Sequence, residues 1–147
     1  MGKKKDKTPK FTWNEETGEA TCIITDGTHY FTGIAKCHPE DMDMKNKLTG
    51  FRIAQLRAEN NYYIHMRDND ILPCHKMLKH LYNCMAQKSD FDKNCNEARL
   101  TRRKIQQNEL DLILVKEMLA DNKKELKSYL AEKDKFYRRI RANRQKD

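Results

Sequence analysis

Two cysteines and two histidines lie close together near the middle of the chain, at Cys74, His75, His80 and Cys84. Thiolate and imidazole groups are ligands that Zn²⁺ favours in proteins. His80 and Cys84 are four residues apart, which places them on one face of a helix. Structural zinc sites usually contain a tight Cys-x-x-Cys pair, which this chain lacks, and Cys74 and Cys84 also fit an apolar helical stripe as small buried side chains. We therefore predict no metal site, and zinc binding stays open as the alternative.

A second cysteine and histidine pair, Cys37-His38, could supply a thiolate and a base. Adjacent residues of an extended chain point to opposite faces, so the pair is badly placed for proton transfer and we expect a structural loop. The chain also lacks a glycine-rich phosphate loop, a nucleophile elbow and a His-Glu-x-x-His motif. Its two serines, Ser89 and Ser128, lie in or beside charged helical sequence. We therefore predict no catalytic residues, no cofactor and no enzymatic activity.

Clusters of basic residues are better candidates for binding, because 30 Lys and Arg against 22 Asp and Glu give a net charge of +8. Such a balance favours polyanionic partners, of which nucleic acid is the commonest. Near the C-terminus Phe136 and Tyr137 alternate with arginines, which suits phosphate contact and base stacking. For any single cluster a solvated helix face with ion pairs is slightly favoured, and three clusters in one small chain shift the balance modestly toward a polyanion. The candidate binding residues are Lys3, Lys4, Lys5, Arg102, Arg103, Lys104, Arg138, Arg139, Arg141 and Arg144.

The composition indicates a chain with much exposed surface. Of its 147 residues 37% are hydrophobic and 35% charged, whereas compact domains are roughly 45 to 50% apolar and about 25% charged. A long exposed helix or oligomerisation would account for this difference. The five cysteines are odd in number and follow no secretory signal, so we expect reduced thiols in a cytoplasm. The sequence contains no run of about 18 apolar residues, so we predict no membrane span.

The first ten residues, 1–10, are predicted to be a flexible basic tail, and residues 11–70 a ββα or βββα unit. Two runs rich in β-branched and aromatic residues flank Asp26-Gly27, the signature of a two-residue hairpin turn of type I′. That turn predicts Ile23 opposite Tyr30. A helix follows and is expected to cover one face of the hairpin, because a lone hairpin is marginally stable in water.

The remaining residues, 71–147, are predicted to be helical. Asp68-Asn69-Asp70 breaks the preceding pattern, one helix spans 72–88, and a long helix spans 91–142 without Pro or Gly. The fold class is therefore α+β. A small antiparallel hairpin or meander packs on a helix and is followed by a helical hairpin or a long coiled-coil-like helix.

The long helix carries a heptad pattern of apolar residues, which Asn108, Asn122 and Lys133 interrupt. Two arrangements explain the pattern: a coiled coil between copies of the chain, or an antiparallel helical hairpin within one chain. Both stay open, because residues 109–119 are apolar on more than one face. The candidate oligomerisation residues are Ile105, Leu112, Val115, Leu119 and Leu126.

The stretches G-I-A-K-C-H-P-E-D and, after a spacer, G-F-R-I-A-Q-L-R-A-E resemble a group of small phage and prophage proteins of Gram-positive bacteria. The similarity covers about 30 of the 147 residues. It implies an accessory phage protein acting in a bacterial cytoplasm, a class in which host-takeover and anti-defence functions concentrate, including inhibitors of CRISPR nucleases. The matching residues are Gly33, Ala35, Lys36, Cys37, His38, Pro39, Asp41, Gly50, Ile53, Ala54, Arg57 and Ala58.

The same motif makes sense as architecture. Gly33 permits a close backbone approach within a strand, and Ile53, Ala54 and Ala58 let a helix lie close to the sheet. In this region the candidate phosphate contacts are Lys36, Arg52 and Arg57.

We therefore expect an accessory protein of the phage type that binds nucleic acid or a host nucleoprotein complex and inhibits it. An RNA-guided CRISPR nuclease is one specific target. The alternative is an oligomeric coiled-coil adaptor or structural protein that binds no nucleic acid. Salt separates the two, because phosphate contacts weaken steeply with ionic strength and an apolar interface does not.

Overall fold

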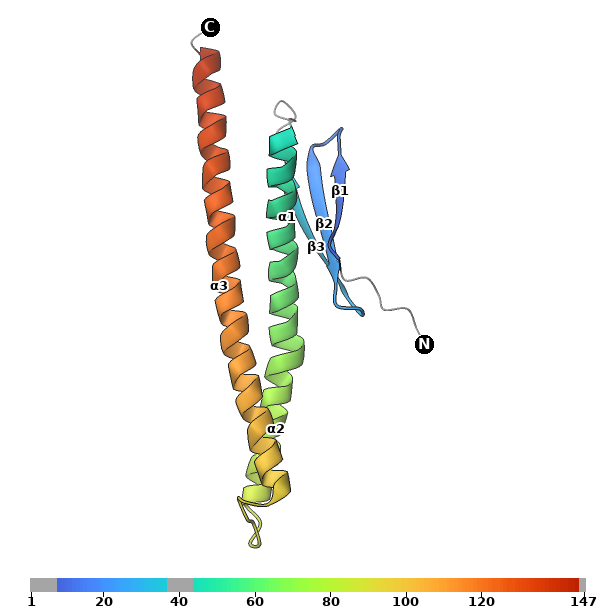
Figure 1. The fold of residues 1–147 in the computed structure, drawn as a ribbon, viewed down its shortest axis with the longest axis vertical. Coiled ribbons are helices and arrows are strands. Elements are labelled where there is room, and N and C mark those ends of the chain that lie inside the picture. The colour runs from blue at the N-terminus through green and yellow to red at the C-terminus, as the bar shows by residue number, and fades with distance from the viewer. Residues whose placement is uncertain (1–7, 37–43, 146–147) are drawn as a thin grey trace. The chain divides into compact units, whose positions relative to one another are not determined.

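The computed structural model describes residues 8–36 and 44–145, which form the predicted α+β fold (Figure 1). Three strands make one antiparallel sheet in the order β1-β2-β3. Helices follow the sheet along the chain, and the last of them is 50 residues long. The elements are β1 (Lys10–Asn14), β2 (Glu19–Thr25), β3 (Tyr30–Lys36), α1 (Met44–His65), the π-helix η2 (Met66–Ile71), α2 (Leu72–Ala86) and α3 (Asn96–Gln145).

The described residues divide into two compact units. The first unit combines the described parts of Met1–Tyr62 and Ala120–Asp147, and the second unit is Tyr63–Leu119. The sheet, most of α1 and the C-terminal half of α3 therefore belong to the first unit. This division differs from the predicted boundary at residue 70, because Leu126 and Tyr129 of α3 pack against the core beneath the sheet.

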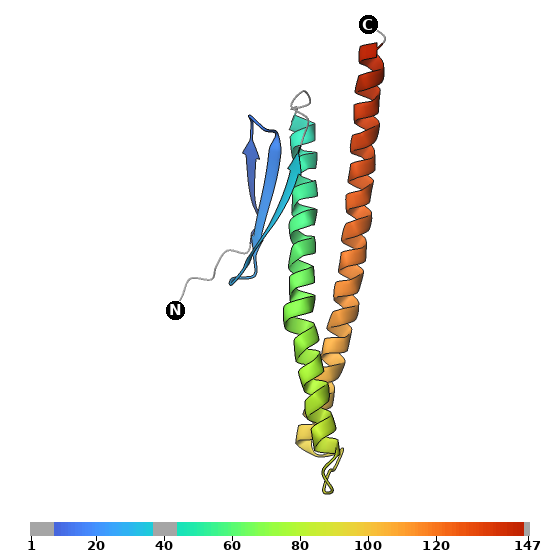
Figure 2. The same cartoon turned by 180° about the vertical axis from the view of Figure 1, so that it is seen from behind.

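The core of the first unit lies between one face of the sheet and α1, and Figure 2 shows from behind how the sheet runs alongside α1. Residues of β2 and β3 alternate between buried and more exposed positions, as expected for a sheet covered on one side. Phe51 and Tyr62 of α1 extend the core, and the ring of Phe51 lies 5.3 Å from that of Phe11. The buried cluster comprises Ala20, Cys22, Ile24, Phe31, Ala35, Ile53, Ala54 and Ala58.

Gly33 sets the distance between the sheet and α1. A Cβ atom at this position would lie 1.9 Å from the carbonyl oxygen of Ala54 and 2.5 Å from the backbone nitrogen of Ala58. Both alanines are fully buried. The predicted close approach is confirmed, and only glycine fits here without moving the helix.

The hairpin between β2 and β3 forms, but its predicted register is wrong by two residues. Ile23 lies opposite Thr32 rather than Tyr30, so the loop is the four residues Asp26–His29 instead of two. A type I′ turn requires positive φ at both central residues, and of the Asp-Gly pair only Gly27 has it, with φ of 99°. Because side chains alternate with a period of two, a shift by two leaves every side chain on its predicted face.

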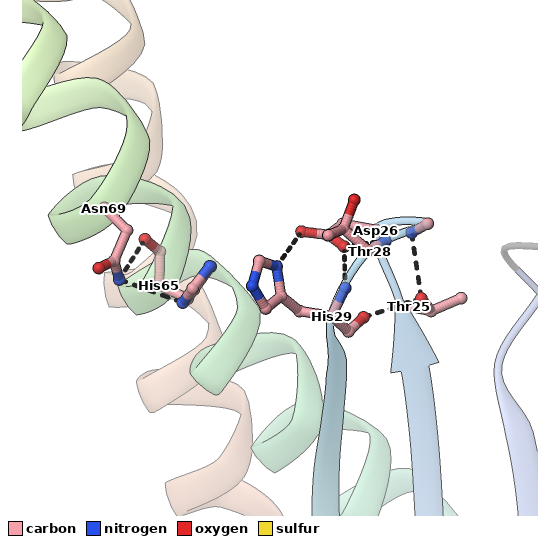
Figure 3. Close-up of polar contacts among 7 residues, drawn as sticks. Thr25, Asp26, Thr28, His29, His65 and Asn69 are labelled. Atoms are coloured by element: carbon pink, nitrogen blue, oxygen red, sulfur yellow. Dashed lines mark hydrogen bonds and ion pairs between the residues drawn. The ribbon is translucent and has the colours of Figure 1, made fainter.

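Side-chain hydrogen bonds explain the longer loop (Figure 3). The Asp26 carboxylate accepts hydrogen bonds from the backbone N–H groups of Thr28 at 2.8 Å and His29 at 2.6 Å. The Thr25 hydroxyl donates to the His29 carbonyl at 2.8 Å and accepts from the Gly27 N–H at 3.0 Å. The bonds from His29 and then Thr28 lower the pKa of Asp26 to about 2. The loop conformation is therefore held by local polar contacts that the Asp-Gly signature alone does not contain.

The predicted break at Asp68-Asn69-Asp70 is wrong, because the backbone stays helical there as η2 and continues directly into α2. The flanking residues, His65 and Leu72, both have right-handed helical φ and ψ angles. The Asn69 side chain donates to the His65 carbonyl at 3.2 Å (Figure 3). A π-helical turn holds more residues than an α-helical turn, so it interrupts the apolar periodicity without ending the helix.

The helices α2 and α3 are both present, with α2 ending at Ala86 rather than 88 and α3 beginning at Asn96 rather than 91. Cys95 precedes the first residue of α3, and its sulfur accepts the N–H of Ala98 at 3.4 Å. Its carbonyl accepts the N–H of Arg99 at 3.0 Å. A side-chain acceptor at this position satisfies one of the unpaired N–H groups at a helix start.

The heptad positions of α3 are covered within a single chain. In the second unit Ala98 and Val115 are at most 2% exposed. Asn108 and Asn122 also lie on this face, and their amide nitrogens are buried without a partner among the described residues. We call this face the inner seam; it comprises Ala98, Thr101, Ile105, Asn108, Leu112, Val115, Leu119, Asn122, Leu126 and Tyr129, all buried or half-buried.

Candidate nucleic-acid interface

Arg52, a predicted phosphate contact, has a structural partner. Its guanidinium donates to Glu125 Oε1 of α3 from Nη2 at 2.7 Å and from Nε at 3.1 Å. The hydrogen bonds to Glu125 raise the pKa of Arg52 further. These two hydrogen bonds to one carboxylate oxygen join α1 to the C-terminal half of α3 within the first unit, so they use donors that a phosphate would need.

Arg57 and Lys36 also make contacts within the first unit. Arg57 Nη1 donates to the Ile34 carbonyl of β3 at 2.6 Å, where it satisfies backbone on the edge strand. Lys36 Nζ lies 3.6 Å from Glu19 Oε1, and the Lys36 carbonyl accepts from Lys133 Nζ. Lys36, Arg52 and Arg57, which were predicted to contact phosphate, therefore help to hold the sheet, α1 and α3 together.

The predicted basic residues at the start of α3 divide into two kinds. Arg102 Nη1 donates to the Tyr82 hydroxyl at 3.2 Å, and the Tyr82 ring lies 5.9 Å from that of Phe91. Arg102 therefore helps to join α2 and α3 in the second unit. Arg103 and Lys104 are exposed and make no polar contact with another described residue. Only these two remain available to an external partner in this cluster.

A row of cations lies on the solvent face of α3 in the first unit. It follows helical spacing of three and four residues, and it lies opposite Leu126 and Tyr129 of the inner seam. Positions 124 to 138 of a helix span about 21 Å along the axis. The exposed Glu132 and Asp134 are beside this row rather than at its positions. We call it the basic stripe; it comprises Lys124, Lys127, Lys135 and Arg138.

All four side chains of the basic stripe are exposed, and none makes an ion pair or hydrogen bond with another described residue. Arg139 is exposed next to the stripe. The predicted candidates Lys3, Lys4 and Lys5 lie outside the described residues, and so do the side chains of Arg141 and Arg144. Of the predicted C-terminal cluster, the structure therefore describes Arg138 and Arg139 as unpaired cations at the surface.

Lys124 and Lys127 were missed by sequence reasoning. The signal was present, because the heptad pattern that predicts the inner seam also defines the opposite face of the helix. Positions 124, 127, 131, 135 and 138 lie on that opposite face and carry no acidic residue. The clusters predicted from the sequence consist of basic residues that are adjacent in the sequence. Charges on one helix face are instead three or four residues apart, so this row was not recognised.

The four candidate zinc ligands do not converge. His80 Nε2 and Cys84 Sγ lie 3.6 Å apart and are both exposed. His75 is buried, with Nδ1 unpaired among the described residues, and Cys74 is half-buried. No third potential ligand joins His80 and Cys84 among the described residues of Tyr63–Leu119. The structure thus brings together two donors, whereas a structural zinc site holds four.

The predicted oligomerisation residues all lie on the inner seam. Val115 is 2% exposed, and the other four are half-buried within the single chain. Contacts within the chain therefore already cover much of this surface. The burial favours the helical hairpin over a coiled coil between copies for these positions, and their role in oligomerisation stays a prediction: Ile105, Leu112, Val115, Leu119 and Leu126.

Comparison with known proteins adds no identity: no family model, no curated protein and no solved structure matches the chain. None of the described helices combines the length and apolar character needed to cross a bilayer. The resemblance to small phage proteins remains an expectation from the motif residues, and the chemistry of the basic stripe is the main guide to function.

Proposed function

We propose that this protein binds nucleic acid through the basic stripe of α3. The observation that carries the proposal is the row formed by Lys124, Lys127, Lys135 and Arg138, exposed and unpaired on one helix face. Lysine and arginine at the surface neutralise phosphates and release their counterions. A straight helix face presents such charges in a line that matches an extended phosphate backbone.

The chemistry of the stripe favours backbone contact over base reading. Lysine is a flexible point charge without the planar geometry that reads a base edge. Three of the four cations are lysines. Binding should therefore depend weakly on sequence and strongly on salt, with a slope of log K against log salt of about −3 to −4 for four phosphate contacts.

The biological partner in this proposal is a host nucleoprotein complex that the protein inhibits by occupying its nucleic acid or the groove that holds it. An RNA-guided CRISPR nuclease is the specific version. This part of the proposal is supported by the resemblance of the Gly33 to Ala58 region to accessory phage proteins, and by the basic charge.

Fluorescence anisotropy with labelled single-stranded RNA, single-stranded DNA and duplex DNA tests the binding step. Reversing the stripe in the variant K124E/K127E/K135E/R138E should weaken binding at least about 100-fold at low salt and flatten the salt slope. Since all four side chains are exposed, the circular dichroism spectrum should not change.

A matched control separates the stripe from net charge alone. The variant K76E/K79E/K88E/K93E reverses four exposed lysines in the second unit and lowers the net charge by the same amount. It should keep most of the affinity if the stripe is the site. Equal losses in both variants would show that only the overall charge matters and would remove the stripe as a site.

Recovery of the tagged full chain from bacterial cells tests the partner. The complex should leave the resin as salt rises, and nuclease treatment should release it. A nucleoprotein that stays bound to the stripe variant would contradict the mechanism, even if it is the true partner.

The coiled-coil adaptor remains the second candidate, and one observation favours it. Leu110, Ile113 and Leu114 of α3 are exposed although they are large and apolar. An adaptor needs an apolar surface that the chain itself does not cover, and the inner seam does not supply it. An assembly that survives high salt, together with no detectable affinity of the chain for RNA or DNA at low salt, would favour this candidate.

A further inference from the structure

A compact patch of large apolar side chains lies on the outer face of α3 in the second unit. Leu110 is 60% exposed, Ile113 56% and Leu114 54%, whereas Val115, the next residue, is 2% exposed. Ile113 and Leu114 lie three and four residues after Leu110, so both neighbour it on the next turn. We call them the outer patch. Scattered single leucines are ordinary on a surface, but a contiguous group marks an interaction site.

We propose that the outer patch is the interface at which two copies of this chain pair as antiparallel helices. The proposal is independent of nucleic-acid binding, because it uses none of the residues of the basic stripe. It also differs from the coiled coil predicted from the heptads, since that pattern is the inner seam and is already covered within the chain.

The position of the outer patch suits helix pairing. A second series of positions, 100, 103, 107, 110, 114 and 117, runs along the face opposite the inner seam at intervals of three and four. All six positions are exposed. Leu110 and Leu114 are consecutive positions of this series and form its apolar part, while Leu100 lies at its start, beyond the polar Arg103 and Gln107.

The area is sufficient for a small dimer. Each outer-patch side chain and Leu100 exposes roughly 100 Å², which gives roughly 800 Å² of apolar surface when two copies meet. A small specific interface buries about 1,200 Å² in total, of which about 57% is apolar. The outer patch and Leu100 together can therefore supply the apolar part of such an interface.

The charges along this segment select a second copy in the antiparallel orientation. The exposed Arg103 and Lys104 lie one to two turns before the patch, whereas Glu109, Asp111 and Glu117 outnumber Lys116 around it. A parallel pair would place Arg103 beside Arg103 of the other copy and Glu117 beside Glu117. An antiparallel pair places the basic part of each helix near the acidic part of the other, which is the complementary arrangement.

Sedimentation equilibrium of the full chain in about 0.5 M salt, where phosphate contacts are screened, tests this proposal. We expect a dimer with Kd of roughly 1–100 µM, as for a small interface. The variant L110E/L114E should weaken the dimer at least 10-fold. The control Leu48→Glu changes a leucine of α1 that is 62% exposed and should leave the dimer unchanged. Unchanged circular dichroism would establish that both variants are folded.

Arg103→Glu tests the orientation. In an antiparallel pair it replaces attraction by repulsion and should weaken the dimer about 3- to 10-fold. In a parallel pair it exchanges one like-charged contact for another and should have little effect, which would overturn the antiparallel arrangement.

A chain that stays monomeric at about 200 µM, above the weakest Kd expected for a small interface, would overturn pairing between copies. If such a monomer lost a co-purified protein when Leu110 and Leu114 were changed, the patch would instead bind a helix of another protein. A dimer that tolerates L110E/L114E would also overturn the proposal, because its interface would lie elsewhere. None of these outcomes alters the expected result for the basic stripe.

Discussion

Two segments of the same helix, residues 98–119 and 120–139 of α3, have similar inner faces and different outer faces. On the inner side both follow the heptad positions, and the inner-seam residues from Ala98 to Tyr129 are buried or half-buried. On the outer side the first carries Leu110, Ile113 and Leu114, and the second carries the basic stripe. The inner face therefore contributes to packing in both segments, while the exposed outer face is apolar in the first segment and basic in the second.

The largest expected loss of stability comes from a substitution on the inner seam of α3. Val115→Asp places a charge at a position that is 2% exposed, and we expect a loss of about 3–5 kcal/mol in the free energy of unfolding. The control variant Lys116→Asp, at an exposed position next to Val115 and outside the proposed interface, should change that free energy by less than about 1 kcal/mol, because it loses only helix propensity. Urea denaturation measures both, and similar losses would contradict the distinction between the two faces.

The first unit offers a second test of close packing. Gly33→Ala should lower the free energy of unfolding by about 3 kcal/mol, since the new methyl group meets helix backbone and not a flexible side chain. Thr32→Ala, at an exposed position on the same strand, is the control and should cost under about 1 kcal/mol. A stable Gly33→Ala variant would mean that α1 can move away from the sheet at little cost.

Substitutions on the outer side of residues 120–139 should change the affinity for nucleic acid and not the free energy of unfolding. Removing two of the four stripe cations in K124A/K127A should reduce the magnitude of the salt slope by about 2 and leave the urea midpoint unchanged. Anisotropy titrations at several salt concentrations give the slope. An unchanged slope would place the phosphate contacts outside the stripe.

The contact between Arg52 and Glu125 should contribute little to the free energy of unfolding, although it joins α1 and α3. Its side chains are 35% and 40% exposed, so solvent screens the pair and we expect a coupling of about 0.5–1 kcal/mol. A double-mutant cycle with Arg52→Ala and Glu125→Ala measures it. A coupling above about 2 kcal/mol would show that the pair is better shielded than its exposure indicates.

The smallest effect concerns the loop at Asp26, which serves as a reference away from α3. Its pKa is lowered from 3.8 to about 2, so the contribution of the ionised carboxylate is fully present above pH 3.8 and is lost as the pH falls toward 2. Amide exchange of Thr28 and His29 should become faster relative to the intrinsic rate at each pH in that range, so their protection factors should fall. Asp26→Ala should show the faster exchange at neutral pH as well.

Sequence reasoning predicted the elements that depend on periodic burial. The alternation in β2 and β3 and the heptads of α3 each report a face that is covered, so both could be read without a structure. The close approach at Gly33 was predicted for the same reason, since glycine and two alanines four residues apart indicate a tight contact between backbones.

Features that depend on particular hydrogen bonds or on distant contacts were not predicted. The four-residue loop follows from the bonds made by Thr25 and Asp26, which compete with the two-residue turn. The π-helix η2 shifts the spacing of the apolar residues, and in the sequence this shift looks the same as the end of a helix. The pairing of Arg52 with Glu125 joins residues 73 positions apart, and no local pattern indicates it.

The contact at Gly33 also provides a means of recognising distant relatives of this protein. A chain that keeps this packing must keep a residue without a side chain on the strand and two small residues one helical turn apart on the helix that crosses it. The spacing from Gly33 to Ala54 and Ala58 is therefore a three-residue signature. It can be sought in sequences whose other residues have diverged too far to align.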